Sequence, residues 1–153
     1  MTPEQKLQSL GISLPNAPKP GAVYQPAVIS GNHIYLSGHV SLDAEGKVIS
    51  GKLGSDYSIE QGQEFAKIVA LLMIATLKDN LDDLSRVKKL VKTLGMVNSS
   101  LDFTSHHLVI NGYSEMMRDI FGPEKGVGAR SAVGMILPLG AAVEIEAIFE
   151  IEE

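Results

Sequence analysis

The chain has 153 residues, about one domain, with 44% hydrophobic and 20% charged residues, an ordinary globular composition rather than a disordered one. The absence of cysteine excludes a disulfide scaffold, a thiol nucleophile and a zinc–thiolate site. The formal net charge of −5 disfavours nucleic acid as a partner, because binding to phosphate backbones requires clustered Lys and Arg. No signal peptide or membrane-length apolar run is visible, so we expect a cytoplasmic protein.

The patterns along the chain predict strands and helices in an alternating order. In chain order we expect a short helix, two strands of a hairpin, a short strand, a long helix, a long strand and a second helix, over residues 3–10, 22–30, 33–40, 47–50, 58–80, 87–97 and 104–121. Ser58 with Gln61 three residues later is a capping box that predicts the start of the long helix. Gly122-Pro123 predicts the end of the second helix.

The last quarter of the chain, residues 128–153, predicts two more strands joined at a proline–glycine corner. From Val143 to Ile151, apolar residues occupy every second position, interrupted on the other face only by Ile148. This period of two is typical of a half-buried strand. We interpret the two strands as a hairpin.

These elements predict a single α+β domain over residues 1–153, with two helices packed on one face of a mixed or antiparallel sheet. The other face would then carry no helices. It would expose an apolar surface that we expect to be covered by oligomerisation, and its members would be Ala132, Val133, Met135, Ile136 and Ile148.

Few residues have the spacing of a known chemical site. The four histidines do not have the spacing of metal ligands, so no metal is expected, and no phosphate-binding glycine loop is present. Ser37 has no nucleophile motif around it. Arg130 is different, because a lone arginine in apolar surroundings needs a partner, and its planar guanidinium matches a carboxylate.

Two partners for Arg130 remain open. One is Glu144, as a structural ion pair, and the other is the carboxylate of a ligand. A turn centred on Leu137-Pro138 would place Arg130 opposite Glu144, whereas a turn near Leu139-Gly140 would displace them by about 13 Å. In the second case they would meet only through a neighbouring subunit or a ligand.

Three segments resemble one known family. GARSAVGM-ILPLGAAVEIEAI is similar to the C-terminal segment of the RidA (YjgF, L-PSP) family, and GNHIYLSGH resembles its G-N-x-I-x-x-S-G-Q segment. Tyr24 and Asn111 also match family positions. The similarity covers residues 20–151, which leaves residues 1–20 as an N-terminal extension. The chain departs from the family pattern at Ala132, where a cysteine is frequent, and at His39, where the family has glutamine.

The resemblance implies a chorismate-mutase-like fold and a homotrimer with ligand clefts between subunits. It implies hydrolysis of 2-imino or enamine acids, such as 2-aminoacrylate, to 2-keto acids and ammonia, with no cofactor. Arg130 would bind the substrate carboxylate and Glu144 would position or activate water. The cleft would be lined by Tyr24, Ser37, Gly38, Asn111 and Ala132.

Two other functions are considered beside this one. A non-catalytic trimer that binds small keto or imino acids would use the same Arg130 cleft. A ribonuclease, as the name L-PSP suggests, is disfavoured by the acidic charge and the lack of a basic groove.

Overall fold

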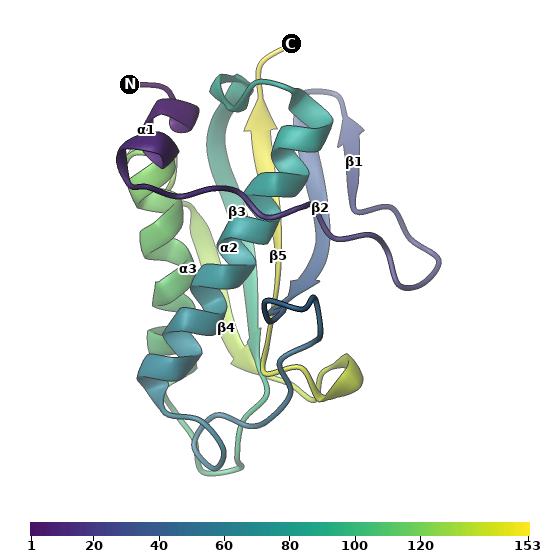
Figure 1. The fold of residues 1–153 in the computed structure, drawn as a ribbon, viewed down its shortest axis with the longest axis vertical. Helices are drawn as coiled ribbons and strands as arrows, with labels where there is room; N and C mark the ends of the chain where they lie inside the picture. Colours follow the sequence, from purple (N-terminus) through teal and green to yellow (C-terminus); the bar gives the residue numbers. More distant parts are fainter.

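The computed structural model describes all residues, 1–153, as one α+β unit (Figure 1). In chain order the helices and strands are α1 (Pro3–Ser9), β1 (Ala27–Ser30), β2 (His33–Val40), α2 (Ile59–Leu81), β3 (Val87–Val97), α3 (His106–Phe121), β4 (Ala129–Gly134) and β5 (Val143–Ile151), with short 3-10 turns at Leu84–Arg86 and Pro138–Gly140. No helix is long and apolar enough to cross a bilayer.

Most element boundaries agree with the sequence prediction, with three corrections. The first strand is only four residues long and begins at Ala27 rather than residue 22. The strand predicted over 47–50 is reduced to single bridges at Val48 and Ser50. The long helix ends one residue later than expected, at Leu81. Its predicted start is confirmed, because Ser58 and Gln61 form both hydrogen bonds of the capping box.

The sheet has the strand order β1-β2-β5-β3-β4, in which only the β3–β4 pair is parallel. The mixed sheet is therefore confirmed, but the predicted C-terminal hairpin is wrong. β4 does not pair with β5, because β3 lies between them and β4 runs parallel to β3.

Helices α2 and α3 cover one face of the sheet, as predicted (Figure 1). They approach closely at Gly112, where a side chain would collide with the backbone carbonyl of Gln63 on α2. α3 is fixed to β3 by a hydrogen bond between the Thr93 and Tyr113 hydroxyl groups, 3.1 Å apart. The inward side chains of β5, such as Phe149, are fully buried in the core beneath the helices.

The opposite face of the sheet carries no helix. Val28 and Tyr35 are paired across β1 and β2, and Tyr35 is paired with Ile148 of β5. Val28 and Tyr35 are exposed, as are Met135 and Ile136 beyond the end of β4. Ala132 does not belong to this surface, contrary to the sequence prediction. It pairs with Gly95 and packs against the main core on the helical side.

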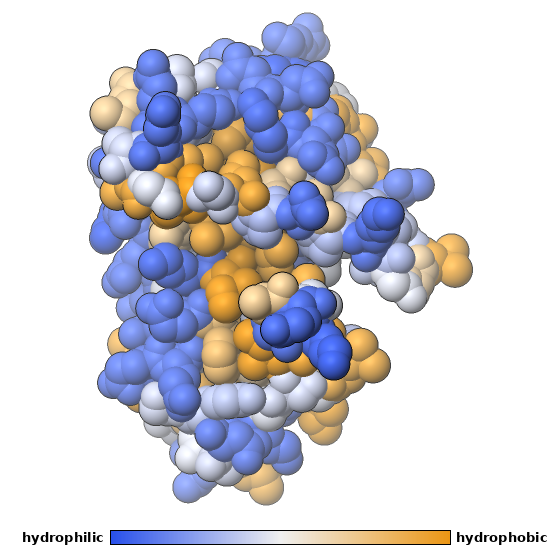
Figure 2. All heavy atoms as spheres, in the orientation of Figure 1, coloured by the Kyte–Doolittle hydropathy of each residue, from blue (hydrophilic) through white to orange (hydrophobic).

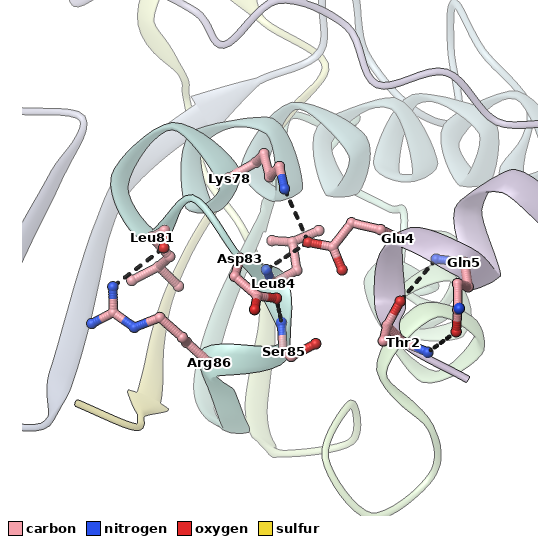
Figure 3. A network of polar contacts seen from close by, with 9 residues as sticks. All are labelled: Thr2, Glu4, Gln5, Lys78, Leu81, Asp83, Leu84, Ser85 and Arg86. Carbon is pink, nitrogen blue, oxygen red and sulfur yellow. Dashed lines mark hydrogen bonds and ion pairs between the residues drawn. The ribbon is translucent and has the colours of Figure 1, made fainter.

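The N-terminal segment crosses the helical side of the molecule. Glu4 on α1 accepts hydrogen bonds from Lys78 Nζ (3.1 Å) and the backbone N–H of Leu84 (2.7 Å), which join α1 to the end of α2 (Figure 3). These bonds hold the pKa of Glu4 below its usual value, although burial opposes them. Ile12 and Leu14 then pack against the core. The segment is thus anchored before it reaches the connector that precedes β1.

Candidate active site

Four of the predicted site residues line one cleft. Tyr24, Ser37, Gly38 and Glu144 contribute to a cavity of about 820 Å³ between β2, β5 and the connector 16–24. In Figure 2 this region is the notch between the protruding connector, on the right, and the lower part of the molecule. Tyr24 is held against the connector because its hydroxyl accepts a hydrogen bond from Gly21 N at 3.3 Å.

Gly38 creates the space for the Glu144 carboxylate. The pairing of β2 with β5 is irregular between Leu36 and His39, and Gly38 lies in this bulge. A Cβ on Gly38 would clash with Oε2 of Glu144. Glycine is therefore required at this position, because the carboxylate rests directly on its backbone.

Ser37 fixes the shape of the bulge. Its backbone N–H donates to Pro26 O (3.0 Å) and its hydroxyl donates to Gln25 O (2.5 Å). The only hydroxyl proton of Ser37 is already donated to a carbonyl. Ser37 therefore lines the cleft and is not a candidate nucleophile.

His39 joins the bulge to α2. Its Nδ1 donates to Ser37 O (2.7 Å), and its Nε2 lies 2.8 Å from the Thr76 hydroxyl, whose proton is shared with Leu72 O (3.2 Å). The side chain is buried, and burial lowers the pKa of His39, so the neutral imidazole with a proton on Nδ1 fits both contacts. Sequence analysis noted His39 only as a departure from a motif, and its distant partner Thr76 has no local signal.

Glu144 is the carboxylate best suited to proton transfer. Its side chain is half-buried, and burial raises the pKa of Glu144, with the neighbouring Glu146 carboxylate adding to the rise. A carboxyl group with a raised pKa in a cleft can exchange protons closer to neutral pH than an ordinary glutamate.

The other predicted residues lie together elsewhere, between β4 and α3. Arg130 donates one guanidinium N–H to Ser114 Oγ and another to His107 O, both at 2.9 Å. Both acceptors are neutral, and Arg130 forms no ion pair in the chain. Its guanidinium is therefore oriented but its charge is not compensated, which suits an incoming anion.

Ala132 and Asn111 belong to this second group. Ala132 lies two residues beyond Arg130 on the same face of β4, and Asn111 lies on α3 between His107 and Ser114. The helical spacing of positions 107, 111 and 114 places them on one side of α3. Sequence analysis missed His107 and Ser114 as partners of Arg130, although that spacing was readable once α3 was known to flank β4.

Arg130 and Glu144 do not meet within one chain. Arg130 aligns through Thr93 of β3 with Ala147 of β5, which is three residues from Glu144. That places their backbones about 10 Å apart across the strands and about 10 Å apart along them. They also occupy opposite faces, because Arg130 contacts α3 whereas Glu144 alternates with the inward residues of β5. A direct pair across a tight turn is excluded. No group of three or more potential ligands forms a metal site.

Comparison with known proteins agrees with this architecture. Residues 4–147 match the family model described as "YjgF/chorismate mutase-like, putative endoribonuclease". The chain belongs to the YjgF (RidA) family. The predicted family and its chorismate-mutase-like fold are thereby confirmed.

Three proteins similar to this chain are particularly informative. Protein TCP17 of Trypanosoma cruzi is 41% identical over 146 residues, which cover 95% of this chain and 91% of TCP17. A 2-iminobutanoate/2-iminopropanoate deaminase of Dermatophagoides farinae is 29% identical and covers 92% of this chain and 95% of its own. The crystal structure of Atu1372 from Agrobacterium tumefaciens, a protein of unknown function, has a TM-score of 0.88 at 38% identity, over 99% and 94% of the two chains.

Proposed function

We propose that this YjgF-family protein hydrolyses 2-imino or enamine acids, such as 2-aminoacrylate, to 2-keto acids and ammonia without a cofactor. The observation that carries the proposal is the Glu144 carboxyl, which is seated on Gly38 in a cleft and has a raised pKa. The similarity to the Dermatophagoides farinae deaminase supports the same reaction class.

The reaction requires only positioning and one proton-transfer group. Arg130 binds the substrate carboxylate, which presents the electrophilic imine carbon to water. Glu144 accepts a proton from that water as its oxygen bonds to the carbon, and the C=N bond becomes a single bond. The substrate reacts as the protonated imine (C=NH2+), so the nitrogen is by then a neutral amine. The same proton, returned from Glu144 to this nitrogen, makes it NH3+, which leaves as ammonia. Loss of the remaining hydroxyl proton then forms the C=O bond of the keto acid.

The site is completed by assembly. Arg130 and Glu144 lie on opposite faces of one sheet, so a cleft holding both needs Arg130 of one subunit and Glu144 of the next. The helix-free face with exposed Val28 and Tyr35 supplies apolar surface for such contacts. The assembly we propose is the homotrimer that the family resemblance implies, a closed ring in which each contact pairs Arg130 of one subunit with Glu144 of the next.

We expect the purified protein to sediment as a trimer at micromolar concentration. The physical reason is the apolar surface on the helix-free side of the sheet, which would otherwise face water. Analytical ultracentrifugation measures this directly. A monomer across the concentration range would contradict both the assembly and the shared site, since neither subunit alone holds a complete cleft.

A trimer that only binds keto or imino acids remains the second candidate. Its support is Arg130, whose uncompensated guanidinium would bind a carboxylate whether or not catalysis follows. Glu144 separates the two functions, because a binding protein does not need a carboxyl group with a raised pKa beside its ligand. RNA is a poorer substrate, since the adjacent lysines Lys88 and Lys89 of β3 are paired with Glu150, at 3.0 and 3.6 Å.

We expect the protein to accelerate imine hydrolysis when an amino-acid oxidase generates the imines in the same reaction mixture. Trapping with semicarbazide measures the imine that survives, so an active protein lowers the semicarbazone signal while total keto acid plus semicarbazone stays constant. The rate should exceed spontaneous hydrolysis by at least about 100-fold, the low end for one general acid–base group. Semicarbazone formation that is unchanged at any protein concentration would favour the binding protein.

A further inference from the structure

The connector 16–24 forms one wall of the Glu144 cleft and carries its only cation. The residues lining the cleft include one lysine, Lys19, and one carboxylate, Glu144. His39 also lines the cleft, but its ring is buried against Thr76 of α2 and burial lowers its pKa, so the neutral form is favoured. Lys19 takes part in none of the ion pairs of the chain. Its positive charge is therefore available to a ligand.

The backbone on either side of Lys19 is conformationally restrained. Pro18 and Pro20 flank it, and a residue between two prolines has few accessible backbone conformations. Upstream, Leu14 packs against the core and Glu4 joins α1 to α2 (Figure 3). Downstream, the Gly21–Tyr24 hydrogen bond closes the connector. Both ends of the connector thus have contacts within the chain, and the Lys19 side chain between them is exposed.

The space between Lys19 and Glu144 is open. The causes that perturb the pKa of Glu144 are burial and Glu146, and both raise it, with no cation opposing them. Lys19 and Glu144 both line the cleft and form no ion pair with each other. The cavity of about 820 Å³ is near the upper end of the range of about 300–1,000 Å³ typical of ligand pockets. This is more room than a three- or four-carbon acid requires.

We infer that Lys19 binds a second anionic group of the substrate. The site would then prefer imino acids whose side chain carries a carboxylate over imino acids with an uncharged side chain. This inference rests on the proposed function in one respect, namely that Arg130 takes the carboxylate next to the imine. The second carboxylate then extends toward the connector, where Lys19 is the available cation. The substrate class is that of imines derived from acidic amino acids.

The experiment compares a dicarboxylic and a monocarboxylic keto acid as product analogues. Binding of 2-ketoglutarate and 2-ketobutyrate is measured by calorimetry for the wild type, Lys19→Met and Lys52→Met. Lys52 is an exposed loop lysine outside the cleft and serves as the matched control. Lys19→Met should weaken 2-ketoglutarate binding about fivefold, the upper end for a partly exposed ion pair. Binding of 2-ketobutyrate should change less than twofold, and Lys52→Met should alter neither.

Three outcomes overturn the inference: equal binding of both acids by the wild type, equal loss of both in Lys19→Met, or no loss. The imine assay separates this result from the proposed function. Imine hydrolysis with a preference for neutral substrates would overturn the role of Lys19 and leave the deaminase standing. Lys19-dependent binding of 2-ketoglutarate without any imine hydrolysis would overturn the deaminase and support the second anion contact.

Discussion

Replacing Glu144 with glutamine is expected to lower the turnover number for imine hydrolysis by about 100- to 10,000-fold, the usual contribution of one general acid–base group. Glutamine keeps the shape that fits over Gly38 but cannot accept the proton of the attacking water. Affinity for 2-ketobutyrate should change little, because Arg130 supplies that interaction. The measurements are the semicarbazide assay and calorimetry on the same preparation.

The matched control for this variant is Glu150→Gln, which removes a carboxylate from the same face of β5, outside the cleft and without effect on the pKa of Glu144. It should keep most activity. Gly38→Ala provides a second route to the same result, because a methyl group would displace the Glu144 carboxylate without changing its chemistry. Full turnover in both Glu144→Gln and Gly38→Ala would contradict a catalytic role and favour the binding protein.

The raised pKa of Glu144 predicts how both activity and folding stability change with pH. If the carboxylate is the base, wild-type kcat/KM should rise with pH through the raised pKa, and this limb should disappear in Glu144→Gln. Folding stability has the opposite trend. The folded state holds the Glu144 proton more tightly than the unfolded state, so this group's contribution to stability falls as pH rises above 4.5 through the folded pKa. Glu144→Gln should therefore melt no lower than the wild type at neutral pH.

The elements of the fold were predictable because their signals are local. The Ser58–Gln61 capping box and the alternation from Val143 to Ile151 depend only on neighbouring residues, and both were confirmed. The order of the strands was not read correctly. β3 and β4 are joined through α3, and a helix crossover between two strands of one sheet favours parallel pairing. Weighing that connection would have separated β4 from β5.

The site was predictable only in part, for a different reason. Arg130 and Glu144 stood out as charged residues in apolar sequence, but nothing local places them on opposite faces of the sheet. The contacts that shape the site join residues far apart in the chain, as His39 joins Thr76 and Arg130 joins Ser114. Such pairs require knowledge of which elements are neighbours. The family resemblance suggested the roles of Arg130 and Glu144, and the structure revealed the contacts that hold the site residues in place.

Replacing Arg130 with alanine is expected to weaken binding of 2-ketobutyrate by about 10- to 100-fold, the range for losing charge-assisted hydrogen bonds. Arg130→Lys should recover only part of the loss, because lysine keeps the charge but not the planar fork. Arg118→Ala removes an exposed arginine of α3 that pairs with Asp119, so it serves as the control with little expected effect. Calorimetry measures all three variants, and unchanged affinity in Arg130→Ala would contradict the role of Arg130.

Mixing the two inactive variants tests whether the site is shared between subunits. In a trimer, a subunit carrying Arg130→Ala still offers Glu144, and one carrying Glu144→Gln still offers Arg130. After denaturation and joint refolding in equal amounts, about one quarter of the clefts should combine an intact Arg130 with an intact Glu144, since each cleft draws two subunits at random. Activity should return to about that fraction of wild type, whereas each variant refolded alone stays inactive. Were both residues supplied by one subunit, no mixture could regain activity, because every site would lack one of them.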